Sequence, residues 1–439
     1  MFTFSSYVYM IYTYAMYVLS LTLAKMARVN IRKTMISTYR TLFSYKGTLS
    51  FTLAGMVARL PLPMMGIGII MMISQLTGSY ALAGTISASF VFTYAVLSPQ
   101  ISRLVDTYGQ YRVLPLFTLI SVIGIGGMLL ATWLQWHISL LFIFAILTGF
   151  MPCISAMIRA RWTAIYKEDS RLQTAYSLES VFDEVTFILG PPISVTLSVA
   201  FFPQAGLLMS AVFLIIGVFL LVLQRNTEPA ITLISSELTP YKTQSVIRFS
   251  LVKILTVIMI FMGVIVGTID IFSVAFANAQ KIPAGASLVL SAYAIGSCFA
   301  GLFFGTLKLS IPLHRLLCLG GIATFLTILP LVFVGSIYSL SLVVLISGIF
   351  FAPMIIVTMS LIEKSVPENQ LTEGMTWLLA GLNVGTAIGA TLTGQLVDYS
   401  GVQSSAWIAI GASTLVMLIA FLGFQRINHK SNKNSKSYA

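Results

Sequence analysis

Residues 102–112 read SRLVDTYGQYR, a short polar segment between two long apolar stretches at about 80–98 and 113–134. Each stretch is long enough to cross the hydrocarbon core of a bilayer, which needs about 20 apolar residues. A polar turn between two such stretches is typical of a loop that joins transmembrane helices. The same alternation of apolar stretch and polar turn continues in both directions along the chain.

Composition agrees with this pattern, because 57% of the 439 residues are hydrophobic, 9% are charged and the mean hydropathy is +0.94. Soluble domains do not reach such values. We therefore predict an all-α polytopic membrane protein with twelve transmembrane helices. The predicted spans lie at about 48–75, 80–98, 113–134, 138–158, 173–199, 203–224, 250–278, 284–307, 313–335, 337–362, 371–396 and 403–425.

Positive charge is concentrated on one side of the predicted membrane. The net charge is +12, and if the first span begins in the cytoplasm, all but two of the 25 Lys and Arg residues fall on the cytoplasmic side. Arg159 and Arg161 are counted there, whereas Lys281 falls outside and Arg59 lies within a span. This positive-inside distribution predicts a multi-pass protein of the cell membrane in which both ends of the twelve-helix core are cytoplasmic. Basic loops of this kind lie near anionic membrane lipid, and we expect no nucleic-acid binding.

The first two dozen residues carry no charge and are rich in tyrosine. Three interpretations are open: an extra N-terminal helix, an uncleaved signal-like segment, or upstream sequence included by a misplaced start, with Met26 and Met35 as alternatives. No small-residue cleavage site is present.

Catalytic and metal-binding signatures are not found in the sequence. Its three cysteines lie far apart in apolar spans, and no HExxH, CxxC, GxSxG or P-loop pattern occurs. We expect no enzyme activity, no metal and no cofactor.

An internal repeat divides the chain into halves. A shift of 203 residues pairs Phe90 with Tyr293 and Arg112 with Arg315. Repeats of this kind are common in transporters. We predict five consecutive parts: an N-terminal apolar and basic segment at 1–45, a six-helix bundle at 46–225, a linker at 226–249, a second six-helix bundle at 250–425 and a basic tail at 426–439.

From about residue 45 onward the sequence resembles the major facilitator superfamily. The family signature between the second and third helices is G-x-L-x-D-x-x-G-x-x-R, and Leu104, Asp106, Gly109 and Arg112 match it, while Ser102 replaces the first glycine. The resemblance implies two six-helix bundles and a monomeric secondary transporter.

Asp106 is a candidate for a conformational latch. A carboxylate at the cytoplasmic end of a helix can pair with a basic residue or a helix N-terminus in the other half. A solvated loop charge is the alternative. The second-half copy of the signature has Leu309 at the acidic position, so a latch there must be weaker or built differently.

Gly190 and Pro191 resemble the core of the family's antiporter motif, although the accompanying glycines are replaced. A proline bends a helix and a glycine permits close packing. The stretch RARW at 159–162, together with SLESVFDEVTFILGPP at 177–192, is similar to a bacterial, largely actinobacterial, group of superfamily members whose substrates are undefined.

Three carboxylates interrupt the fifth predicted span, at Glu179, Asp183 and Glu184. Asp183 and Glu184 lie about ten residues into the span, or roughly 15 Å, which is close to the bilayer midplane. Arg59 lies equally deep in the first span. An unpaired charge at this depth costs about 2.5–3.5 kcal/mol or more, so we expect Arg59 to face one or both acids.

These groups have two interpretations. They form a static ion pair that fixes helix packing, or they form a titrating set that couples transport to protons, since three acids outnumber one arginine. Asp270, nearer the outer face in the seventh span, is a further candidate for this set.

Other features point to the same depth. Pro61 and Pro63 follow Arg59, and we expect unwound backbone there that lines protein or water. Tyr293, Trp377 and Asn383 are candidate substrate contacts from the second half. The function predicted is proton-coupled efflux of a small amphiphilic or drug-like molecule, with proton-coupled uptake of a metabolite or peptide-like solute as the alternative.

Overall fold

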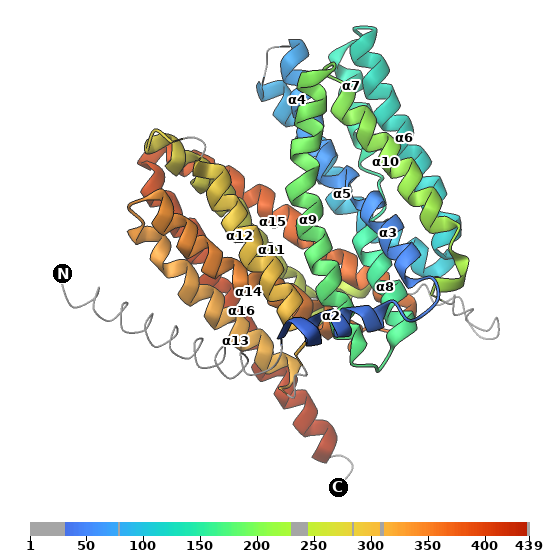
Figure 1. Cartoon of the computed structure of the whole chain (residues 1–439), viewed down its shortest axis with the longest axis vertical. Coiled ribbons are helices and arrows are strands. Elements are labelled where there is room, and N and C mark those ends of the chain that lie inside the picture. Colours follow the sequence, from blue (N-terminus) through green and yellow to red (C-terminus); the bar gives the residue numbers. More distant parts are fainter. Residues whose placement is uncertain (1–30, 78–79, 230–244, 283–284, 308–310, 437–439) are drawn as a thin grey trace.

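The computed structural model describes residues 31–77, 80–229, 245–282, 285–307 and 311–436, and this part of the chain contains helices and no strand. The apolar segment at 1–24 and most of the linker at 226–249 lie outside the described residues. Two groups of helices stand side by side (Figure 1). The first group consists of α3 (Thr48–Arg59), α4 (Pro61–Thr77), α5 (Tyr80–Tyr108), α6 (Gln110–Trp133), α7 (Ile138–Thr148), α8 (Ile154–Tyr166), α9 (Arg171–Ala200) and α10 (Ala205–Val222).

The second group follows after the linker. It consists of α11 (Ser250–Ala279), α12 (Gly285–Phe304), α13 (Leu313–Ile328), α14 (Ile337–Glu363), α15 (Leu371–Ser400) and α16 (Val402–Lys436). Short 3₁₀ turns occur at Arg225–Thr227, Val246–Arg248, Leu329–Phe333 and Glu368–Gln370. One further helix, α2 (Ile31–Leu42), precedes the first group.

Each predicted span corresponds to one helix or to two consecutive helices. Within the described residues, nine helical segments are long and apolar enough to cross a membrane. Three predicted spans are not among these nine. One is α12, whose apolar part at Leu288–Phe304 is short; another is α9, which carries the three carboxylates; and the third is divided between α7 and α8. The all-α membrane architecture is therefore confirmed, and the number of twelve crossings stays a prediction.

The helical path is interrupted in the fourth predicted span, 138–158, and not at the prolines of the first. α7 ends at Thr148 and α8 begins at Ile154, so residues 149–153 form no regular helix. Most of these five residues are buried, as non-helical backbone at membrane depth must be. Ser121 Oγ donates to the Thr148 carbonyl at 2.8 Å and so satisfies one acceptor at this helix end.

The predicted unwound backbone after Arg59 is wrong. Only Leu60 separates α3 from α4, and its backbone is helical, with φ −50° and ψ −37°. Pro61 and Pro63 lie in the first turn of α4. A proline in a first turn removes only N–H groups that have no partner within that helix, so both prolines are compatible with helix on either side.

Small residues bring helix backbones together in the second group. A β-carbon built at Gly267 of α11 would lie 2.8 Å from the Ala390 nitrogen of α15, and one at Gly389 would lie 2.8 Å from the Val264 Cα atom. Close backbone approach is a usual source of packing energy between helices in lipid, where apolar burial gives none.

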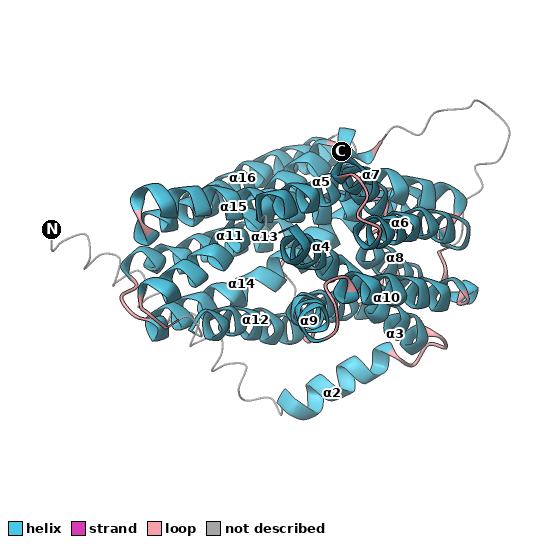
Figure 2. Cartoon of the chain, turned by 90° about the horizontal axis from the view of Figure 1, so that it is seen from above, coloured by secondary structure: helices cyan, strands magenta, loops and turns pink. Residues whose placement is uncertain are grey.

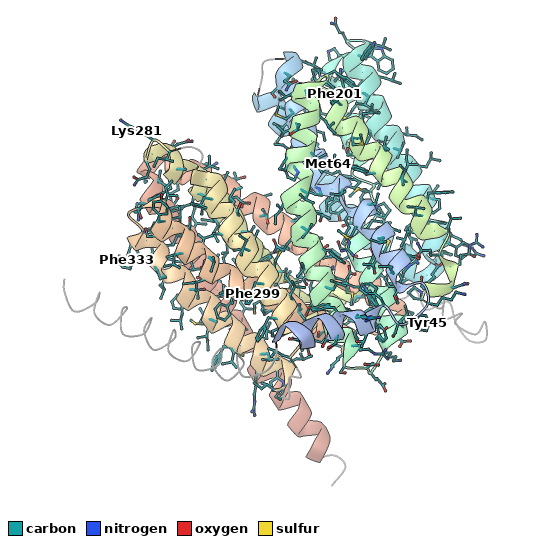
Figure 3. All side chains as sticks on the ribbon, viewed as in Figure 1. Tyr45, Met64, Phe201, Lys281, Phe299 and Phe333 are labelled. Carbon is teal, nitrogen blue, oxygen red and sulfur yellow. The ribbon has the colours of Figure 1, made fainter. Side chains whose placement is uncertain are left out.

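The two groups meet at one end of the molecule and separate toward the other (Figure 1). The end at which they meet carries α2, which lies across the outside of the bundle beside α9, α12 and α3 (Figure 2). We call this the α2 end and the opposite one the far end. Tyr45 lies at the α2 end, whereas Phe201 and Lys281 lie at the far end (Figure 3).

Candidate functional site

Glu179 of α9 lies inside the first group of helices and is fully buried. Arg59, the last residue of α3, forms a salt bridge with its carboxylate, and Trp162 of α8 donates its indole N–H to Glu179 Oε1 at 2.7 Å. Both carboxylate oxygens therefore have a donor. The structure thus brings Arg59 and Glu179 together in the way that the depth of the two residues predicts.

Asp183, one turn further along α9, has a second arginine. Arg159 Nη2 lies 2.7 Å from Asp183 Oδ2, and Ser155 Oγ donates to Oδ1 at 2.6 Å. Arg59 Nη1 is 3.4 Å from the same Oδ1. Glu179 and Asp183 are thus linked through Arg59 into one ionic network, which α3, α8 and α9 build within the first group.

Arg159 and Arg161 differ from the prediction, because both are buried on α8 instead of lying in a basic loop. Arg161 donates to Gln110 Oε1 at 2.7 Å and to the Leu221 and Gln224 carbonyls at the end of α10, so it closes a helix terminus. Arg159 was missed as a partner of Asp183. The spacing of the sequence could have indicated this contact. Ser155, Arg159 and Trp162 recur at helical intervals along residues 154–166, so they share one face of a helix.

Two arginines therefore balance two carboxylates, which changes the charge count on which the titrating interpretation depended. An ion pair buried in this way is costly to break, since removing one partner leaves an uncompensated charge. The network of Arg59, Arg159, Glu179 and Asp183 consequently fits a fixed structural role within the first group.

Glu184 is turned away from this network toward the second group. Its Oε1 accepts a hydrogen bond of 3.0 Å from Ser297 Oγ of α12. Asp183 and Asp270 of α11 both lie near enough to interact with it electrostatically. In the described part of the chain, no lysine or arginine forms an ion pair with Glu184 or Asp270.

Tyr293 of α12 completes this second set of polar groups. It is 8% exposed, its ring packs on Phe351 at 5.7 Å, and its side chain lies near those of Glu184 and Asp270. The cluster of Glu184, Asp270, Tyr293 and Ser297 comes from α9, α11 and α12, and so belongs to both helix groups. It is the part of the site that a relative movement of the groups would change.

Trp377 and Asn383, the two other predicted substrate contacts, are not part of this cluster. Trp377 Nε1 is 3.4 Å from Glu373 Oε1 in the first turns of α15, at the α2 end. Asn383 is half-buried on the same helix and makes no hydrogen bond within the described residues.

The predicted helix-break residues contact one another instead of breaking helices. Pro191 lies inside the continuous helix α9. A β-carbon built at Gly190 would lie 2.8 Å from Pro63 Cγ and 3.4 Å from Met64 Cγ, so α9 and α4 approach closely here. Met64 lies between Tyr45 and Phe201 along the molecule (Figure 3). The ionic network, one to two turns before Met64, is therefore remote from the far end.

Asp106 caps a helix of the opposite group. Its Oδ1 and Oδ2 accept from the backbone N–H groups of Thr372 and Glu373, at 3.2 and 2.8 Å, in the first turn of α15. These N–H groups have no partner within their own helix, and they carry the positive end of its dipole. Ser102 Oγ lies 2.7 Å from Thr376 Oγ1 and extends the contact.

The remaining signature residues shape the turn after α5. Gly109 has φ +86° and ψ 155°, a backbone conformation that is essentially restricted to glycine. Leu104 is 39% exposed, and the Arg112 guanidinium lies 5.1 Å from the centre of the Tyr111 ring. Within the described residues, the side chains of Leu104 and Arg112 form no hydrogen bond with α15.

A third link between the groups is the salt bridge of Lys167 with Glu368 at the α2 end. The hydrogen bond to Glu368 raises the pKa of the Lys167 ammonium above its ordinary value. Both side chains are more than half exposed, so the pair adds little to stability.

Metal chemistry has no candidate residues in the described segments, where no group of three or more His, Cys, Asp or Glu side chains could hold an ion. Cys153, Cys298 and Cys318 are free thiols.

Comparison with known sequences agrees with this architecture. The Major Facilitator Superfamily profile matches residues 3–284 and 271–438. The chain is 22% identical over 352 residues to the multi-drug resistance efflux pump PmrA homolog of Lactococcus lactis subsp. lactis (strain IL1403), which covers 76% of this chain and 83% of that protein.

Solved structures share the fold at low sequence identity. A bacterial homologue of the iron transporter ferroportin, in an outward-facing state, has a TM-score of 0.70 and 15% identity over 86% of this chain and 99% of its own. The E. coli fucose:proton symporter FucP has a TM-score of 0.64 and 14% identity over 85% and 98%. The sequence match over both halves and the shared helical fold lead to one conclusion: the chain belongs to the major facilitator superfamily.

Proposed function

We propose that this membrane transporter is a monomeric secondary active exporter, which carries a small amphiphilic or drug-like molecule outward by alternating access in exchange for protons. The observation that carries the proposal is Glu184. It is a carboxylate on α9 whose hydrogen-bond partner, Ser297, is a neutral side chain of the other helix group. A carboxylate with no arginine beside it can bind and release a proton without breaking an ion pair.

The orientation of the protein is part of the proposal. The distribution of Lys and Arg predicts that the α2 end faces the cytoplasm. We place the protein in a bacterial plasma membrane because its sequence is similar to bacterial members of the superfamily. In this orientation the described state is closed to the cytoplasm by the Asp106 contact, and the helix groups separate toward the outside (Figure 1).

Export is supported by the similarity to a multi-drug resistance efflux pump homologue, at 22% identity. Uptake of a metabolite or peptide-like solute is the competing outcome. We propose transport and no catalytic reaction, because no catalytic motif was recognised in the sequence.

The test uses purified protein in proteoliposomes. A panel of amphiphilic dyes and drugs, sugars and short peptides is measured for transport with an imposed proton gradient and again after a protonophore collapses it. Gradient-driven movement of amphiphiles, with proton flux in the opposite direction, is expected. Movement of a sugar or peptide together with protons would support uptake, and transport that ignores the protonophore would contradict proton coupling.

A matched pair of variants connects the result to the site. Glu184→Gln removes the titrating carboxylate but keeps an oxygen that can accept from Ser297. Asp169→Asn is the control, because within the described residues the Asp169 carboxylate bonds to Arg171 alone, at 2.8 Å to its backbone nitrogen and 2.6 Å to Nη2. Only the first variant is expected to lose gradient dependence.

A further inference from the structure

The carboxyl end of α12 is the counterpart, in the internal repeat, of the end of α5 that carries Asp106. The sequence there has Leu309 where the first copy has its acidic residue. A carboxylate cap of the kind made by Asp106 is therefore impossible at this position. The structure nevertheless joins the two helix groups here.

The last carbonyl groups of a helix have no partner within that helix. Three side chains of α2 and α9 donate to carbonyls at the end of α12. Tyr39 Oη donates to Leu302 at 2.7 Å, Thr174 Oγ1 to Gly305 at 2.6 Å, and Gln173 Nε2 to Phe304 and Leu307 at 2.9 and 3.2 Å. The chemistry is the reverse of the Asp106 contact, since neutral side-chain donors meet backbone acceptors.

Close approach of the elements makes these bonds possible. A β-carbon built at Gly305 would lie 2.6 Å from Tyr39 Oη and 2.6 Å from Ser177 Cβ of α9. A larger residue at Gly305 would therefore displace the Tyr39 side chain and require Ser177 of α9 to shift.

Helix α2 is attached to both groups. The buried Tyr166 of α8 donates its hydroxyl to the Leu42 carbonyl at 2.7 Å, and the Leu42 side chain is fully buried. Tyr39, one turn earlier on α2, reaches the end of α12. The helix therefore runs from one group to the other at the α2 end (Figure 2).

We propose that the carboxyl end of α12 is a second gate, which Tyr39, Gln173 and Thr174 hold shut, and that α2 is the strap that carries Tyr39. The inference rests on the alternating access of the proposed function, but not on proton coupling or on the direction of transport. Opening at the α2 end separates α9 and α2 from α12 and breaks these bonds together. Each bond consequently stabilises the state that is closed at this end.

The test measures the width of this end directly. Spin labels are attached at Ser170→Cys and Ile311→Cys, which lie at exposed positions beside α9 and α12, in a background with Cys298 and Cys318 replaced by alanine. Cys153 is retained because it is 3% exposed. Double electron–electron resonance then gives the distance distribution, from which the open and closed populations are obtained.

The gate variants are Tyr39→Phe and Thr174→Val, which remove a hydroxyl and preserve size and shape. We expect the ratio of open to closed populations to rise about three- to tenfold for each, and more for the two together, as one neutral hydrogen bond is lost. Controls are Tyr45→Phe, whose side chain is 51% exposed, and Thr85→Val, whose hydroxyl bonds at 2.9 Å only within its own helix. Both controls should match the parent protein.

Distances in the gate variants that equal those of the controls would overturn the proposal, provided that Asp106→Asn shifts the same label pair. If Thr174→Val does not fold, Gln173→Met replaces it, because methionine keeps the side-chain length without a donor. Substrate and proton gradient are absent from the measurement. A failure of the proton-coupling proposal therefore leaves the distances unaffected.

Discussion

Glu184 accepts its hydrogen bond from the neutral Ser297, whereas Glu179 and Asp183 each contact an arginine. We predict that Glu184→Gln folds as well as the parent protein, because glutamine retains the acceptor oxygen. Gradient-driven accumulation should fall to the level of protein-free liposomes, while counterflow exchange, which needs no net proton movement, persists. Full gradient-driven accumulation in this variant would remove Glu184 from the coupling step and leave Asp270 to be tested.

Glu179 should behave differently, since its loss leaves Arg59 buried without its closest partner. We predict that Glu179→Gln lowers the free energy of unfolding by about 3 kcal/mol or more. Adding Arg59→Met should recover part of this loss, with a coupling energy of about 1–3 kcal/mol between the two positions. Thermal unfolding in detergent measures the cycle; strictly additive effects would contradict a structural ion pair.

Among the helices, the contact of α5 with α15 depends on one carboxylate. Asp106→Asn removes the charge that faces the dipole of α15 and one of two acceptor oxygens. We predict a loss of about 1–2 kcal/mol for the state closed at the α2 end, which is a five- to thirtyfold shift in population. Spin labels at Tyr108→Cys and Ser365→Cys, both exposed, report the distance. The control is Asp169→Asn. Asp169 is also a carboxylate that accepts hydrogen bonds, which hold its pKa below the ordinary value, but its partner Arg171 belongs to the same helix group.

The turn between α5 and α6 depends on Gly109, whose φ of +86° and ψ of 155° strain any other residue. We predict that Gly109→Ala costs about 1–3 kcal/mol of stability. Gly126→Ala is the control, because Gly126 lies within helix α6 and a β-carbon there meets nothing within 4 Å. Equal unfolding midpoints for the two variants would show that the turn adapts to a side chain.

Elements set by local chemistry were predicted from the sequence, and those set by tertiary packing were not. The lengths of the apolar stretches predicted the helices, and the equal depth of Arg59 and the acids of α9 predicted their contact. The interruption at 149–153 contains Gly149 and Pro152, but the expected span was drawn on apolar length, which continues through these residues. The prolines at 61 and 63 mark a helix start, which in a sequence resembles a break. Arg159 was assigned to a loop because basic residues near span ends usually lie outside the membrane, whereas α8 buries it against Asp183.

At the scale of the whole molecule, the polar contacts divide into two kinds. The ionic network of Arg59, Arg159, Glu179 and Asp183 lies within the first group, so a rigid-body movement of that group leaves it intact. The contacts of Asp106, Glu184 and the end of α12 join the groups, so the same movement must break them. Under the proposed function, proton coupling is expected to act through contacts of the second kind, where Glu184 and Asp270 are the candidate carboxylates.

Orientation in the membrane decides which side each contact closes. We predict that an impermeant thiol reagent applied to intact cells labels Phe201→Cys, which is 73% exposed at the far end (Figure 3). The reagent should spare Tyr108→Cys, at the end of α5 beside Asp106, and Ser170→Cys, at the start of α9. The reason is the charge distribution of the sequence, which predicts that the basic loops remain in the cytoplasm. Permeabilised cells provide the control, because all of these positions should then react. The opposite labelling pattern would make Asp106 and the end of α12 external gates, and the state described here would be open to the cytoplasm.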